Sequence, residues 1–150
     1  MKTLLDPKTL DETIERVNKI TPDAPAVFGK LSPHSMLCHL IDSFEIGFGQ
    51  KGELKINSGF LNSKLGRWFV IDSPIPWPKG KLDAPPEFLE TTACDSFDQD
   101  REKVLSLLKK FQDGETQSWG ISPLLGKLGP QQWGRLQFRH TDHHLQQFGC

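Results

Sequence analysis

The chain has 150 residues, of which 36% are hydrophobic and 25% charged, and its formal net charge is −1 at pH 7. A chain of this length can bury roughly two thirds of its unfolded surface around one core, so we expect a single domain over residues 1–150. The aromatic content and low net charge exclude an intrinsically disordered chain. The charge balance argues against binding to nucleic acid or to an anionic membrane.

Three further features bear on location. The N-terminal sequence MKTLLDPKTLDE reaches acidic residues and a proline too soon for a secretory signal, and no segment approaches the roughly twenty apolar residues of a membrane span. Cys38, Cys94 and Cys150 are odd in number and far apart, which favours reduced thiols over a disulfide framework. These features predict a cytoplasmic protein with neither membrane nor nucleic-acid partners.

Two helices are predicted in the first third of the chain. Asp6 followed by Pro7 is typical of an N-cap with proline at the first helical position, and apolar residues recurring at helical spacing extend this helix over 7–20. The loop TPDAPAVFGK follows, and Ser32 and Pro33 then repeat the same start signal. We therefore expect a second helix over 33–48.

The middle of the chain carries mixed signals. Apolar residues at helical spacing predict a third helix around 60–69. Five prolines and one glycine follow in the segment SPIPWPKGKLDAPP, residues 73–86, and they exclude a continuous helix or a central strand. A long ordered connection is the expectation here, and Trp77 within it could either line a pocket or anchor the loop.

The last third predicts two more helices. Ser96 and Gln99 have capping-box spacing ahead of an apolar run that stops before Gly114. A segment rich in glycine, proline and serine then leads to Pro130, from which a final helix should run to about residue 148. Four principal helices with one long crossover connection favour an all-α four-helix bundle.

One face of the final helix combines large apolar side chains with imidazoles. At about 100° per residue, the residues within roughly an 80° sector are Trp133, Leu136, His140, His144 and Gln147. Because tryptophan and leucine favour the interior, His140 and His144 should point toward the core, with His143 at the edge of the sector. Phe138 and Leu145 lie opposite, where they could pack on another element or on a second subunit.

His140 and His144, one helical turn apart, can ligate the same ion without distorting the backbone. A catalytic zinc-like site needs a third protein ligand, for which His39 is the best candidate because it borders the apolar stripe of the second helix. His34 lies near the start of that helix and is expected to be exposed. The alternative is that the histidines are ordinary core or surface residues with hydrogen-bond partners.

Other chemistry finds little support. Thr141, Asp142 and His143 separate the two histidines, so the glutamate of an H-E-x-x-H metalloprotease motif is missing. The sequence contains no P-loop, G-x-G-x-x-G, G-x-S-x-G or C-x-x-C motif. Cys38 adjoins His39, but neighbours on a helix point about 100° apart and cannot form a nucleophile–base pair directly.

Three segments resemble one known family. The sequences MLCHL at 36–40, PWPKG at 76–80 and RHTDHHLQQFG at 139–149 are similar to motifs of an uncharacterised branch of the DinB-like superfamily. This resemblance implies a four-helix bundle with a long crossover, commonly dimeric. It also implies a divalent metal held at the positions of His39, His140 and His144. Our leading hypothesis is that this metal is zinc or nickel.

The activity implied by the resemblance is open. Better understood members of the superfamily include metal-dependent thiol S-transferases that use a low-molecular-weight thiol, and others are regarded as hydrolases. In such an enzyme His143 or Gln147 could orient the ligands or the bound group. One departure is Ser122 before Pro123, where a His-Pro pair is expected, which puts substrate handling in doubt. The alternative is a non-catalytic dimeric binding or stress-response bundle with structural histidines.

Overall fold

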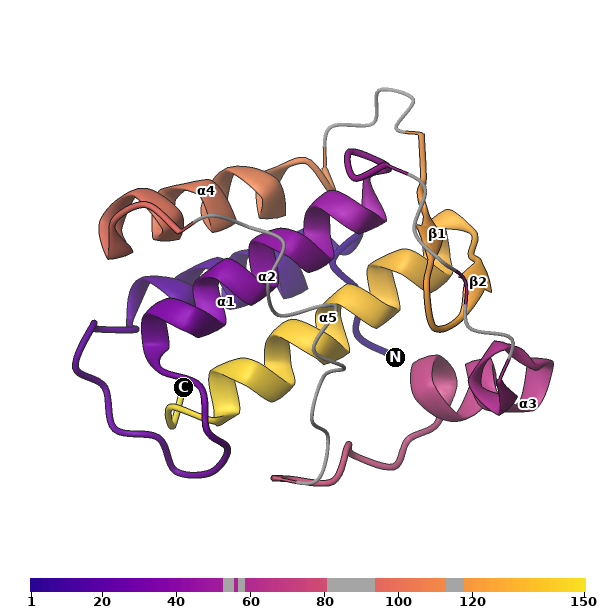
Figure 1. The fold of residues 1–150 in the computed structure, drawn as a ribbon, viewed down its shortest axis with the longest axis horizontal. Helices are drawn as coiled ribbons and strands as arrows, with labels where there is room; N and C mark the ends of the chain where they lie inside the picture. Colours follow the sequence, from indigo (N-terminus) through magenta and orange to yellow (C-terminus); the bar gives the residue numbers. More distant parts are fainter. Residues whose placement is uncertain (53–55, 57–58, 81–93, 113–117) are drawn as a thin grey trace.

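The computed structural model describes residues 1–52, 56, 59–80, 94–112 and 118–150 (Figure 1). Within these residues the chain is mostly helical, as the all-α prediction requires, with one small antiparallel sheet. The elements are α1 (Pro7–Asn18), α2 (Pro33–Gly47), η1 (Phe60–Asn62), α3 (Lys64–Arg67), η2 (Trp68–Asp72), α4 (Phe97–Lys109), β1 (Ile121–Ser122), β2 (Gly126–Lys127) and α5 (Pro130–Gln146).

The predicted helix starts are confirmed by their caps. The Asp6 carboxylate accepts a hydrogen bond from the Thr9 amide at 2.9 Å, and the Ser32 hydroxyl accepts one from the Ser35 amide at 3.1 Å. Ser96 forms the expected capping box at the start of α4. These side chains satisfy amide groups that the first helical turn leaves without backbone partners, which fixes where each helix begins.

The single helix predicted around 60–69 is wrong in detail. The segment forms a 3₁₀ turn, a four-residue α-helix and a π-helical turn. Ser63 is the break, because its extended backbone ends η1 while its hydroxyl accepts a hydrogen bond from the Gly66 amide at 3.1 Å. A Cβ atom at Gly66 would collide with the Phe60 carbonyl, so glycine permits this close approach. Of the connection expected over 73–86, residues 81–86 lie outside the described residues.

The hairpin of β1 and β2 was not predicted. Ile121 pairs with Lys127 and Ser122 with Gly126, so each strand has only two residues. Gly126 has a φ of +70°, a conformation that favours glycine, and the Ser122 hydroxyl accepts a hydrogen bond from the Leu125 amide at 3.1 Å. Strands this short carry no alternating hydrophobic pattern, and for that reason they leave no recognisable signal in the sequence.

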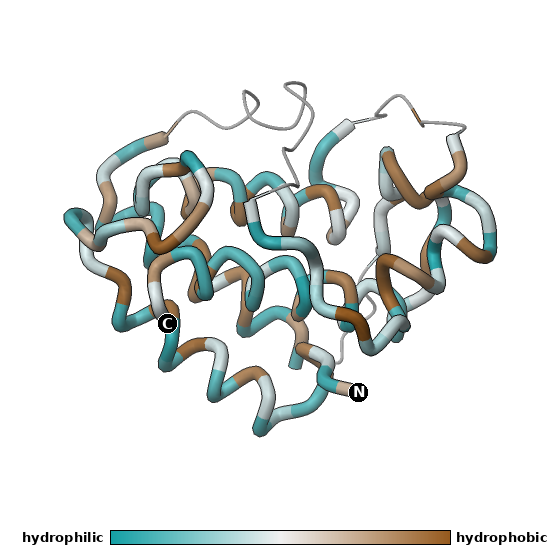
Figure 2. The backbone as a smooth tube through the Cα atoms, turned by 90° about the horizontal axis from the view of Figure 1, so that it is seen from below, coloured by the Kyte–Doolittle hydropathy of each residue, from teal (hydrophilic) through white to brown (hydrophobic). Residues whose placement is uncertain are grey.

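Four of the α-helices pack against one another. α2 contacts α4 and α5, and α1 contacts the same two helices (Figure 1). In Figure 2 apolar and polar residues are interspersed along the helical turns, as expected of amphipathic helices. The main buried cluster joins all four helices, with Leu10, Phe44, Leu108 and Leu145 among its members.

A smaller buried cluster lies under the hairpin and η2. It is formed by Ile71, Leu125, Leu128 and Trp133. Trp133 belongs to this cluster and Leu145 to the main one, so α5 contacts the two clusters through different faces. The group formed by Phe138 and Leu145 therefore packs on other elements of the same chain. Among the helices of the described residues, none is long and apolar enough to span a bilayer.

The prediction of reduced cysteines is wrong for two of the three in this structure. Cys38 and Cys94 form a disulfide across 56 residues of sequence, with their Cα atoms 5.9 Å apart, and Cys150 is free. The packing of α2 on α4 brings the second turn of α2 beside the residues that precede α4. Sequence separation alone could not reveal this proximity.

Candidate metal centre

Three histidines from two packed helices converge on one point. α2 contributes His39, and α5 contributes His140 and His144, one turn apart. The Nε2 atom of His140 lies 2.9 Å from Nε2 of His39 and 3.0 Å from Nε2 of His144. One ring nitrogen from each histidine lies within 4.8 Å of the others. The structure thus brings together the three residues that the sequence pattern singled out.

Burial favours the neutral form of His140 and His144. The exposed fraction is 8% for His39 and 7% for His144, whereas His140 is half-buried as a residue. Desolvation and the neighbouring His39 lower the pKa of His144 to about 3. Burial, together with the other histidines, also holds the pKa of His140 well below its ordinary value. At neutral pH the rings of His140 and His144 are therefore uncharged, with lone pairs available to a cation.

Gln147 fixes the tautomer of His144. The Oε1 atom of Gln147 lies 2.8 Å from Nδ1 of His144, so Nδ1–H donates to the amide oxygen and Nε2 carries the lone pair. That Nε2 faces Nε2 of His140, which can direct its own single hydrogen at only one of its two histidine neighbours at a time.

The residues fit a divalent metal ion. Zinc–nitrogen bonds of about 2.0–2.1 Å in a tetrahedron place ligand nitrogens about 3.3 Å apart. The two separations from His140, 2.9 Å to His39 and 3.0 Å to His144, are a few tenths of an ångström shorter, and the third pair lies within 4.8 Å. Small ring rotations at His39, His140 and His144 would supply the difference. Three imidazole nitrogens this close together form a donor set of a type that can hold a divalent cation.

The loop after α1 holds Gln147 in place. The Val27 amide donates to the Gln147 carbonyl at 2.7 Å. Gly29 has a φ of +83°, and a Cβ atom there would come within 2.6 Å of the Gln147 side-chain nitrogen. Only glycine permits this close approach in a left-handed conformation, so the local chain geometry keeps room for the residue that orients His144.

His143 lies between the three histidines and a pocket. Its ring centroid is 5.6 Å from that of His144, 5.5 Å from Phe28 and 5.9 Å from Trp77. Burial is the main cause that lowers the pKa of His143 below its ordinary value. The expectation that His143 orients a bound group stays a prediction, and its position beside both the cluster and the pocket is compatible with it.

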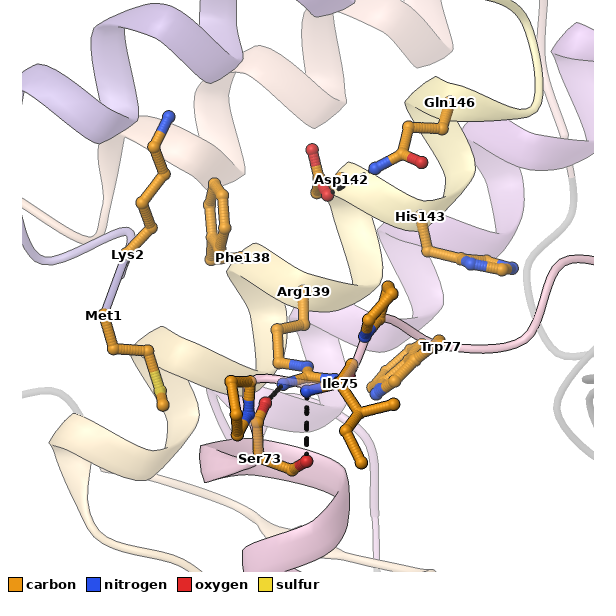
Figure 3. Close-up of a pocket in the computed structure, with 12 residues that line it drawn as sticks. Met1, Lys2, Ser73, Ile75, Trp77, Phe138, Arg139, Asp142, His143 and Gln146 are labelled. Atoms are coloured by element: carbon orange, nitrogen blue, oxygen red, sulfur yellow. Dashed lines mark hydrogen bonds between the residues drawn. The ribbon is translucent and has the colours of Figure 1, made fainter.

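The pocket has a volume of about 500 Å³ and is shown in Figure 3. It is lined by the N-terminus, the segment after η2 and the outer face of α5, namely Met1, Lys2, Ser73, Pro74, Ile75, Pro76, Trp77, Phe138, Arg139, Asp142, His143 and Gln146. The Trp77 ring also lies 6.2 Å from the His140 ring, measured between centroids. Trp77 and His143 therefore separate the pocket from the three histidines.

Hydrogen bonds fix the wall of this pocket. The Arg139 guanidinium donates to the carbonyls of Ser73 and Ile75, as Figure 3 shows, and its carbon lies 5.6 Å from the centroid of the Trp77 ring. The Trp77 indole donates to the Val70 carbonyl at 3.1 Å. Both interpretations of Trp77 thus hold, since it anchors its loop and also lines the pocket.

A second group of ligand-type side chains was not recognised in the sequence. His34, Cys38, Cys94 and Asp100 each place one such atom within 4.8 Å of the others. His34 was expected to be exposed, but it is half-buried and its Nε2 lies 2.7 Å from Oδ2 of Asp100. The spacing of His34 and Cys38 by one helical turn was the only available signal, because Cys94 and Asp100 come from a distant element.

Comparison with known proteins adds no relative. No described family, curated protein or solved structure gives a significant match to this chain. The resemblance to the DinB-like superfamily therefore depends on the three short motifs, whereas the geometry of His39, His140 and His144 is independent of it. Ser122, where the resemblance led us to expect a histidine, uses its hydroxyl within the hairpin.

Proposed function

We propose that this protein binds one divalent metal ion, zinc or nickel, through His39, His140 and His144. The observation that carries the proposal is the convergence of the Nε2 atoms of His39, His140 and His144, with His140 within 3.0 Å of both others. Gln147 supports it, because a ligating histidine typically donates its other ring N–H to an oxygen acceptor. Histidines with a purely structural role have no need to direct three lone pairs at one point.

The fold we propose is a DinB-like four-helix bundle. Its helices are α1, α2, α4 and α5, and the chain between α2 and α4 is the crossover connection. Pairwise packing of α1 and α2 on both α4 and α5 supports this arrangement. By the same resemblance we propose that the protein forms a homodimer. From the N-terminal sequence and the lack of a long apolar segment we propose that it is located in the cytoplasm.

The activity we propose is metal-dependent transfer to a low-molecular-weight thiol, or hydrolysis, with a small-molecule substrate of unknown identity. When bound, a divalent ion lowers the pKa of a coordinated thiol or water molecule, which makes it nucleophilic near neutral pH. Trp77 and Phe138 offer an apolar wall in the adjoining pocket. The neutral ring of His143 lies between pocket and metal ligands, where it can accept a proton from a bound group.

Metal content tests the binding proposal first. Protein purified without a histidine tag, with the Cys38–Cys94 disulfide intact, is measured by plasma mass spectrometry beside the His140→Ala/His144→Ala variant. We expect close to one zinc or nickel per chain in the wild type and none in the double variant. His143→Ala is the matched control on the same helix and should keep its metal. A wild type that neither carries metal nor takes up added zinc or nickel would refute the proposal.

Turnover tests the enzymatic part separately. Fully metal-loaded protein is assayed against electrophiles with and without a panel of low-molecular-weight thiols, because transfer needs the thiol and hydrolysis does not. Activity should disappear on metal removal and fall in His143→Ala. Full metal occupancy without turnover of any electrophile, in the presence or absence of thiols, would favour the non-catalytic binding bundle instead.

A further inference from the structure

A second cluster of ligand-type side chains links the start of α2 to the start of α4. We propose that His34, Cys38, Cys94 and Asp100 bind a zinc ion when both cysteines are reduced. The Cys38–Cys94 disulfide is then the oxidised, metal-free state of the same site. This site is separate from the three-histidine centre and does not depend on the function proposed for it.

The geometry gathers four ligands of the right types. His34 and Cys38 lie one turn apart on α2, so both face the same neighbour, and Cys94 and Asp100 approach from the start of α4. All four ligand atoms lie within 4.8 Å of one another. Two cysteines, one histidine and one aspartate are ligands that zinc accepts in tetrahedral sites. Two thiolates and one carboxylate would also balance the charge of the ion to within one unit.

Asp100 is the most informative member of the cluster. Only 2% of its surface is exposed, and its Oδ2 accepts a hydrogen bond from the Asp95 amide at 3.0 Å while lying 2.7 Å from Nε2 of His34. The same oxygen is 3.7 Å from the Cys38 sulfur, which carries no hydrogen in the disulfide. A disulfide needs no buried carboxylate directed at its sulfur, whereas a zinc ion at this point needs the negative charge.

Oxidation and metal release are one process at this site. Cys94 is exposed and Cys38 is buried, so the Cys94 thiolate attacks a low-molecular-weight disulfide, forms a mixed disulfide and expels one small thiolate. The Cys38 thiolate then attacks the Cys94 sulfur, closes the protein disulfide and expels the second small thiolate. Two electrons pass from the protein sulfurs to the small disulfide, and the ion leaves because a disulfide is a poor ligand.

Cobalt titration reports thiolate ligation directly. The full chain is reduced with a phosphine, which takes up one oxygen atom from water and leaves two thiols, and is then freed of reductant under anaerobic conditions. Added Co²⁺ should produce near-ultraviolet thiolate-to-cobalt charge-transfer absorption that is displaced by zinc. The band should saturate at one thiolate-bound ion per chain, which corresponds to about two added ions per chain if the three-histidine centre fills as well. Binding at the three histidines gives no such band, so wild-type protein can be used.

Matched variants and the redox state decide the outcome. The band should be absent in the unreduced protein and in Cys94→Ser, whose exposed position makes the change mild for the fold, and retained in Cys150→Ser. A low-molecular-weight disulfide should abolish it. Asp100→Asn should weaken cobalt binding by about 10- to 100-fold or more, since removing a residue that only orients a metal ligand already costs that much. Failure of the reduced wild type to develop the band, or its persistence in Cys94→Ser, would overturn the proposal.

Discussion

Protonation of the buried histidines should make the metal-free protein unstable in mild acid. The pKa of His144 is about 3 in the folded chain and 6.5 without the fold. The unfolded chain binds the proton more readily than the folded chain does. Protonation of His144 therefore leaves the free energy of unfolding unchanged well above pH 6.5 and lowers it as pH falls from about 6.5 toward 3. Between pH 7 and pH 5 this single residue should lower the free energy of unfolding by about 2 kcal/mol.

Urea unfolding of chelator-treated protein at several pH values measures this loss. The comparison is with His144→Asn, which keeps a polar side chain of similar reach but does not titrate in this range. The variant should lose less stability on acidification, and the difference between the two curves between pH 7 and pH 5 should be about 2 kcal/mol. Equal pH dependence in wild type and variant would refute the view that the fold holds His144 neutral.

Three further predictions concern single side chains. Gln147→Ala should weaken zinc binding about 10- to 100-fold in chelator competition, because His144 loses the acceptor that fixes its tautomer. Trp133→Ala should lower the free energy of unfolding by about 3–5 kcal/mol in a urea titration, since the ring is only 2% exposed. Gln137→Ala removes hydrogen bonds to the Ser43 hydroxyl and carbonyl and should cost about 1–3 kcal/mol by the same measurement, with metal content unchanged.

Local signals account for the parts of the fold that the sequence predicts well. α1, α2 and α4 begin where a capping side chain precedes the helix, and α5 begins at a proline. Such signals involve residues three or four apart and need no tertiary information. The break at Ser63 was missed because apolar spacing continues across it, and only the close approach of Gly66 to η1 makes the break visible.

The candidate sites also combine features that local sequence signals predict with features that depend on tertiary contacts. His140 and His144 share a face by helical periodicity alone, and His39 follows from the apolar stripe beside it together with the family resemblance. That His39 meets the pair depends on the register of α2 against α5, which no local pattern encodes. Cys94 and Asp100 were missed for this reason, because their partners His34 and Cys38 lie on another helix.

The contacts of Gln147 connect metal binding to the opening of a surface loop. Its carbonyl receives the Val27 amide while its side chain orients His144. Any ligand that favours the ordered arrangement of His144 and Gln147 also disfavours local states in which the loop has separated from α5. Amide hydrogen exchange at Val27 should therefore slow on metal loading, which makes this backbone position a reporter of site occupancy that needs no knowledge of the substrate.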